Sequence, residues 1–177
     1  SLLEAEAPGP TGERLTPRVR QTARRLWAVY IGFTIVLAAA YMVAGMGLYD
    51  GVAHSFTTVS TGGFSPYNSS LGHFESGAIE WIAIAAMFLA GTSFTLLYRA
   101  LRGSVGPLLR SKEFHVYSLL VLAVATVFFF TNDATGSVAD RIRGACFATT
   151  TITSTTGYGT DDFASWSQSS QLLVMLL

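Results

Sequence analysis

Three long stretches of this chain carry no charged side chain, and they constrain the fold more than any other feature. They cover residues 26–49, 81–98 and 114–132, which are 24, 18 and 19 residues long. A membrane core of about 30 Å is crossed by about 20 residues of α-helix. Helices buried in a large soluble protein seldom lack charge on every side. Charged residues make up only 12% of the chain, against about 25% in soluble domains. We therefore predict an all-α membrane protein with three spans, and residues 172–177 predict the start of a fourth.

The basic residues lie on one side of these spans. Nine of the eleven lysines and arginines either precede the first stretch or lie between the second and third. The positive-inside rule places those segments in the cytoplasm. The other side carries seven acidic residues against only Arg141 and Arg143, and an acidic outer face attracts cations. We predict a multi-pass protein of the inner (cytoplasmic) membrane. The net charge of zero gives no reason to expect nucleic-acid binding.

Between the spans lie two shorter segments with the same pattern. In each, a moderately apolar helical stretch (residues 49–59 and 140–153) runs into a Ser/Thr-rich loop with glycine beside an aromatic residue. Ser60-Thr-Gly-Gly-Phe64 aligns with Ser154-Thr-Thr-Gly-Tyr158 at an offset of 94 residues. A helix of about ten residues reaches about 15 Å, half of the membrane, so we predict that both segments re-enter instead of crossing. Irregular backbone at that depth must face protein or water, and this arrangement predicts an ion pore.

The two loops contain the groups that a selectivity filter needs. A cation that has lost its water shell requires oxygen ligands, which the backbone carbonyls of an extended loop supply. The predicted filter consists of Ser60, Thr61, Gly62, Gly63, Ser154, Thr155, Thr156, Gly157 and Tyr158. Within it, the predicted potassium ligands are Thr61, Gly62, Gly63, Thr155, Thr156 and Gly157.

Glycines and aromatic rings are expected to shape these loops. Positive φ angles, which turn successive carbonyls toward one axis, are expected at four glycines because glycine adopts them without steric cost. These are Gly62, Gly63, Gly157 and Gly159. Phe64 and Tyr158 are expected to pack behind the loops and to fix their width.

The remaining polar residues predict structure more than chemistry. Asp50 and Asp140 are expected to cap the short helices, because helix N-termini favour negative charge. His54 is expected to form a local hydrogen bond instead of binding a metal. Asp161 and Asp162 either attract cations at the outer mouth or end a solvated loop. The sequence has no nucleophile, phosphate-binding or paired-carboxylate motif, so we predict a protein that is not an enzyme and has no covalent cofactor.

The two loop motifs are accompanied by further short motifs at residues 6–10, 15–18, 53–56 and 162–166. With them, essentially the whole chain resembles the Trk/Ktr/HKT superfamily of potassium transporters, closest to the bacterial TrkH-type potassium uptake proteins. The resemblance implies repeats of transmembrane helix, re-entrant pore helix with filter loop, and transmembrane helix around a pseudo-fourfold pore. In that family one filter glycine per repeat governs potassium preference, which implies Gly63 and Gly157. Gly62 stands where the other loop has Thr156, so the two ion cages are not equivalent.

This chain would then be an internal fragment of the four-repeat fold. The implied parts are a cytoplasmic basic segment (1–25), the second pore repeat (26–102), a cytoplasmic loop (103–111) and a truncated third repeat (112–177). The implied function is potassium uptake, with K+ as substrate and either symport or channel-like passage as the mechanism. Alternatives are a sodium/potassium-permeable or channel-type cation pore, and a non-conducting membrane signalling or scaffold subunit. The implied partners are membrane lipid, a second copy in a homodimer and a cytoplasmic nucleotide-binding regulator of the TrkA type.

Overall fold

The computed structural model describes residues 17–131, 137–160 and 171. Several predictions fall outside these residues: the fourth span at 172–177, the role of Asp161 and Asp162, and the motifs at 6–10 and 162–166. The described residues form helices, turns and loops and contain no strand, which confirms the all-α fold class. The helices are α1 (Pro17–Val43), α2 (Leu48–Val59), η2 (Ser70–Phe74), α3 (Gly77–Ala90), α4 (Phe94–Leu101), α5 (Gly106–Leu109), α6 (Lys112–Thr131) and α7 (Val138–Thr153).

Two helices have the length and hydropathy of membrane spans, as predicted for the first and third charge-free stretches. They are the Arg20–Val43 part of α1 and the whole of α6. Helix α1 ends before the charge-free stretch does, because Gly45 adopts a φ of 113° and the chain turns there. The N–H of Met46 donates to the carbonyl of Tyr41 (3.0 Å) and closes the end of the helix. The next residues then begin α2.

The second charge-free stretch is not one straight span, and this corrects the prediction. It is divided into α3 and α4, which meet at an angle of 108°. The break falls at residues 91–93, where glycine, threonine and serine are weaker helix formers than the apolar residues before them. Gly91 also lies directly against α6: a Cβ placed on it would come within 2.5 Å of the Tyr117 hydroxyl. The absence of charge predicted the apolar segment but not its bend.

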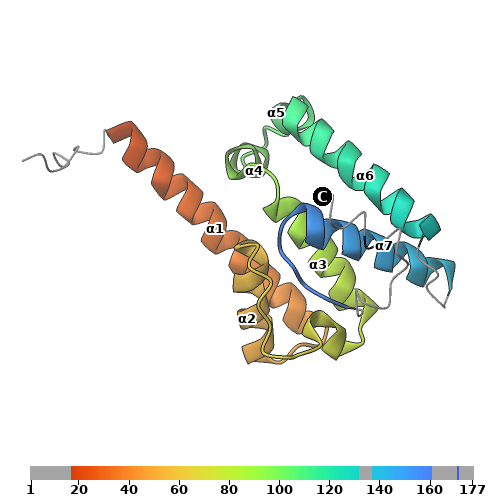
Figure 1. The fold of residues 1–177 in the computed structure, drawn as a ribbon. Coiled ribbons are helices and arrows are strands. Elements are labelled where there is room, and N and C mark those ends of the chain that lie inside the picture. The colour runs from red at the N-terminus through yellow and green to blue at the C-terminus, as the bar shows by residue number, and fades with distance from the viewer. Residues whose placement is uncertain (1–16, 132–136, 161–170, 172–177) are drawn as a thin grey trace, which may run out of the picture.

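The helices pack so that α3 joins the two halves of the chain. Helix α2 lies along α1, α6 lies along α7, and α3 packs against α7 (Figure 1). The Arg143 guanidinium of α7 donates to the Glu80 carboxylate of α3 at 2.7 Å. One apolar cluster of buried residues includes Tyr41 and Met87 from the first half and Phe147 and Tyr158 from the second. The loops that follow α2 and α7 are therefore held next to each other by a shared core.

Candidate functional site

The loops that follow α2 and α7 have left-handed residues at the same two positions. In the first loop, Thr61 and Gly63 have positive φ angles of 51° and 63°. In the second loop, Thr155 and Gly157 have positive φ angles of 58° and 83°. Each pair corresponds at the offset of 94 residues that aligned the two sequences. In each loop the residue between the two left-handed ones does not have a positive φ, and such an alternation turns successive carbonyls in a different way from a regular helix or strand.

The hydrogen bonds that lead into the loops also match at this offset. The N–H of Ser60 donates to the carbonyl of Phe56 at 3.0 Å, as that of Ser154 does to Thr150. One turn later, the N–H of Gly63 donates to the carbonyl of Thr57 at 3.2 Å. Its counterpart is the bond from the N–H of Gly157 to the carbonyl of Thr151, at 3.1 Å. Both helices therefore end by the same hydrogen-bonded turn, which fixes the direction of the loop.

The positions of the left-handed residues correct part of the glycine prediction. Gly63 and Gly157 have positive φ as expected, but Gly62 and Gly159 do not. Threonine occupies the other left-handed position of each loop, although a β-branched residue is a marked outlier there. Such a conformation costs about 1–3 kcal/mol and is typically found at functional sites. Sequence reasoning missed it because no sequence pattern signals a strained threonine.

The two loops touch through their backbones. A Cβ placed on Gly63 would lie 1.9 Å from the carbonyl oxygen of Thr156. The first loop therefore has no room for a side chain at this position. A Cβ on Gly157, in contrast, would meet no described atom within 4 Å. Two glycines that are equivalent in sequence thus face different surroundings.

The hydroxyls of the second loop bond to each other. Ser154 and Thr156 are both buried, and their hydroxyl oxygens are 2.7 Å apart. Gly62 takes the place of Thr156 in the first loop, so this pair has no counterpart there. Ser60 instead is exposed and donates weakly to the Thr57 carbonyl at 3.4 Å. The predicted difference between the two loops therefore has a structural consequence in their side-chain bonding.

Tyr158 braces the second loop against α2. Its ring is 0% exposed, as predicted for a residue behind the loop. Its hydroxyl lies 2.5 Å from Oγ1 of Thr57 and 3.0 Å from Oγ1 of Thr58, and donates to the carbonyl of His54 at 3.1 Å. From the sequence, Phe64 is expected to pack behind the first loop in the same way. This prediction is wrong for the described part of the chain, where Phe64 is 77% exposed.

His54 forms local hydrogen bonds, as predicted. Its Nδ1 lies 2.8 Å from the carbonyl of Asp50, and its Nε2 lies 3.0 Å from the hydroxyl of Ser65. A carbonyl only accepts, so Nδ1 carries the proton in this pair. The buried imidazole therefore ties α2 to the end of the first loop. No group of three histidine, cysteine or acidic side chains gathers as a metal site in the described ranges.

The two aspartates at the starts of the short helices differ. Asp140 forms a reciprocal capping box with Ser137 at the start of α7, as predicted. The hydrogen bond from Ser137 and then that from Arg143 lower the pKa of Asp140. For Asp50 the capping prediction is wrong, because the N-cap of α2 is Gly47 and has no side-chain cap. Asp50 instead accepts a hydrogen bond from the Tyr67 hydroxyl at 3.2 Å.

A short segment that no motif predicted holds the far end of the second loop. The N–H of Gly72 in η2 donates to the carbonyl of Gly159 at 3.2 Å. The Ser70 hydroxyl accepts from the N–H of Gly159 at 3.3 Å. A Cβ on Gly72 would lie 2.7 Å from the Thr160 carbonyl, so glycine is required at this contact. These contacts join residues far apart in sequence, and no local pattern could have revealed them.

Comparison with known proteins identifies relatives along nearly the whole chain. Residues 1–177 match the family described as TrkH, cation transport protein. The chain is 35% identical over 172 residues to the Trk system potassium uptake protein TrkH of Vibrio parahaemolyticus, covering 93% of this chain and 36% of that protein. It is 34% identical over 173 residues to the Trk system potassium uptake protein TrkG of Escherichia coli, covering 93% of this chain and 35% of that protein.

The fold agrees with a solved structure of the same kind. The crystal structure of the potassium transporter TrkH from Vibrio parahaemolyticus superposes with a TM-score of 0.85 and 33% identity, covering 91% of this chain and 36% of that one. The chain thus spans about a third of the length of these relatives. Its apolar helices and this match make it part of a membrane protein. The chain belongs to the TrkH cation transport protein family.

Proposed function

We propose that the two loops form part of the selectivity filter of a potassium uptake pore. The observation that carries this proposal is the pair of left-handed residues at equivalent positions of the two loops, Thr61 and Gly63 in one and Thr155 and Gly157 in the other. Two loops of one chain that adopt the same strained conformation side by side are suited to surround a common axis. The predicted ligands are the carbonyls of Thr61, Gly62, Gly63, Thr155, Thr156 and Gly157.

The short helices support ion passage electrostatically. Helices α2 and α7 both end at the loops, and the C-terminal end of a helix carries a partial negative charge. Such ends, together with the carbonyls of unwound segments, coordinate cations within membranes. A potassium ion that approaches from outside would exchange its water shell for carbonyl oxygens in the loops. Catalytic chemistry has no part in this mechanism, and K+ is the substrate.

The surrounding protein is proposed on the pattern implied by the resemblance. Residues 26–102 would form the second pore repeat and residues 112–177 part of the third, in a multi-pass protein of the inner membrane. The remaining filter loops would come from other parts of a longer chain. A homodimer and a TrkA-type nucleotide-binding regulator are the proposed partners, with residues 14–25 and 99–112 as basic contact surfaces for the regulator. The relatives named as potassium uptake and transport proteins support potassium over other ions.

Rubidium uptake tests the proposed function. The full-length gene would be expressed in bacteria that lack their own potassium uptake systems, with its regulator and with either Gly157→Ser or Gly144→Ser. A Cβ meets no described atom within 4 Å at either glycine, but only Gly157 has a positive φ. We expect rescue by the wild type and by Gly144→Ser, and a lower preference for potassium over sodium with Gly157→Ser. An unchanged preference in Gly157→Ser would refute its place in the filter. No rescue by well-expressed wild type would favour the scaffold alternative.

A further inference from the structure

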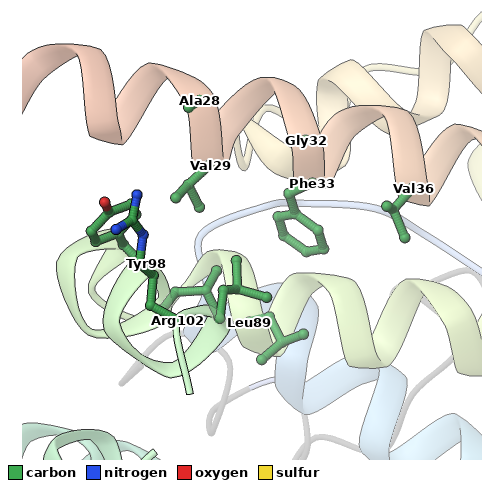
Figure 2. Close-up of a pocket in the computed structure, with 10 residues that line it drawn as sticks. Ala28, Val29, Gly32, Phe33, Val36, Leu89, Tyr98 and Arg102 are labelled. Atoms are coloured by element: carbon green, nitrogen blue, oxygen red, sulfur yellow. The ribbon is translucent and has the colours of Figure 1, made fainter. Parts of the chain in front are cut away.

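An apolar cavity lies between α1, α3 and α4, outside the pore loops. It has a volume of about 560 Å³. Val29, Phe33 and Val36 of α1 point toward Leu89 of α3 and toward α4, as Figure 2 shows. The bend of 108° between α3 and α4 lies beside this space, which is lined by residues on both sides of the bend. The cavity is thus wide and apolar enough for part of an acyl chain.

The cavity is open on its outer side. Ala28 and Gly32 are exposed along one edge, and Val36 and Leu101 are 66% and 71% exposed. Apolar side chains this exposed on a membrane-spanning helix face either lipid or other protein. No described atom lies within 4 Å of a Cβ on Gly32. The entrance is therefore lined by small residues that leave room for a chain to enter from the side.

Two arginines lie close to Tyr98 at one end of the cavity. The guanidinium of Arg102 lies 5.3 Å from the centre of the Tyr98 ring, and that of Arg25 lies 5.9 Å from the same ring. Tyr98 and Arg102 line the cavity at this end (Figure 2). Within the described ranges, neither arginine pairs with a carboxylate, since the ion pairs there belong to Arg143. Arg102 thus lines the cavity, and Arg25 lies near the same ring. Guanidinium groups pair well with phosphate, so this end of the cavity suits a phosphate group.

We propose that this cavity binds an anionic phospholipid of the cytoplasmic leaflet, with an acyl chain between α1 and α4 and its phosphate at Arg25 and Arg102. The positive-inside rule places these arginines at the cytoplasmic surface, where anionic lipids lie. Basic pockets between transmembrane helices on that side are suited to such head groups. The apolar cavity and the paired charges together match both parts of a lipid. The proposal depends on this orientation and not on ion conduction, so lipid binding and potassium uptake can fail independently.

Native mass spectrometry of the full-length protein tests this site. The protein would be stripped of lipid in detergent and titrated with phosphatidylglycerol, and separately with phosphatidylcholine of the same acyl chains. The variant Arg25→Gln/Arg102→Gln removes both charges of the site. Its control, Arg20→Gln/Arg24→Gln, removes two exposed charges from α1 that do not line the cavity. Gly32→Leu fills the entrance without removing charge.

We expect the wild type to prefer phosphatidylglycerol. An arginine that pairs with the lipid phosphate contributes about fivefold to affinity, so Arg25→Gln/Arg102→Gln should bind this lipid about 30-fold more weakly. The control should stay within about twofold of the wild type, since only the charges at the cavity are proposed to hold the phosphate. Gly32→Leu should also lose binding, which a general attraction of anions to basic protein would not explain. Equal affinity for both lipids, an equal loss in the control, or unchanged binding by Gly32→Leu would overturn the proposal. So would a protein segment found in the cavity when the full-length structure is determined in a lipid nanodisc.

Discussion

Replacing Gly63 by alanine should disturb the proposed filter far more than the same change at Gly157. Both glycines have left-handed φ angles, 63° and 83°, where an alanine costs about 1–2 kcal/mol. At Gly63 a second cost is added, because the Cβ would lie 1.9 Å from the Thr156 carbonyl oxygen. That oxygen, itself a proposed ligand, would have to retreat until the separation reaches at least 3.0 Å.

The structure gives the size of the difference. Overpacking costs about 1–3 kcal/mol, so the total at Gly63 is about 2–5 kcal/mol. If these energies oppose the conducting loop conformation, uptake falls roughly 5- to 30-fold in Gly157→Ala and roughly 30- to 5,000-fold in Gly63→Ala. Displacement of the Thr156 carbonyl should also reduce the preference for potassium over sodium in Gly63→Ala.

The assay is the initial rate of rubidium uptake by cells that express the full-length gene, normalised to the amount of protein in the membrane. Gly144→Ala serves as the control, because a Cβ there meets no described atom within 4 Å and its φ is ordinary. It should retain wild-type uptake. Equal losses in Gly63→Ala and Gly157→Ala, or wild-type uptake by Gly63→Ala, would contradict the close contact between the two loops.

Two further outcomes follow from the contacts around the loops. Tyr158→Phe should lower the free energy of unfolding by only about 1 kcal/mol, because the Thr57 and Thr58 hydroxyls keep backbone acceptors on α2. Thermal unfolding in detergent measures this change. A loss of more than about 3 kcal/mol would contradict this explanation. The second outcome concerns Asp140, whose pKa is lowered by the Ser137 hydrogen bond. Its contribution to stability is present above the pKa of an unfolded aspartate, about 3.9, and is lost as pH falls through the lower folded value. Acid should therefore reduce the unfolding temperature of the wild type more than that of Asp140→Asn. If the unfolding temperatures of both proteins fell equally with pH, the role of this cap would be refuted.

The sequence carried enough information to predict the helical class and the position of the two loops. Charge-free stretches and a repeat at 94 residues are strong signals, because membrane insertion and an internal repeat each leave a regular trace along the chain. The bend at residues 91–93 left no such trace, since its residues are uncharged like their neighbours. Local propensity lowers the stability of a helix there, but the contact of Gly91 with Tyr117 arises only in three dimensions.

Details of the loops could be predicted only in part for the same reason. Glycine at positions 63 and 157 is readable as a need for positive φ, whereas the left-handed Thr61 and Thr155 are held by surrounding structure. Asp50 lies near the start of a helix like Asp140, yet it bonds to Tyr67 because the chain folds back over it. Whether an acidic residue caps its own helix depends on such competing partners, which the local sequence does not show.

Anomalous X-ray diffraction from crystals of the full-length protein soaked in rubidium tests the central claim most directly. The account predicts an anomalous peak from rubidium between the carbonyls of residues 61–63 and those of residues 155–157. In crystals soaked in sodium instead, the occupancy of this site by sodium should be lower. Rubidium bound elsewhere in the pore, with no peak between these two loops, would contradict the assignment of the loops as the filter.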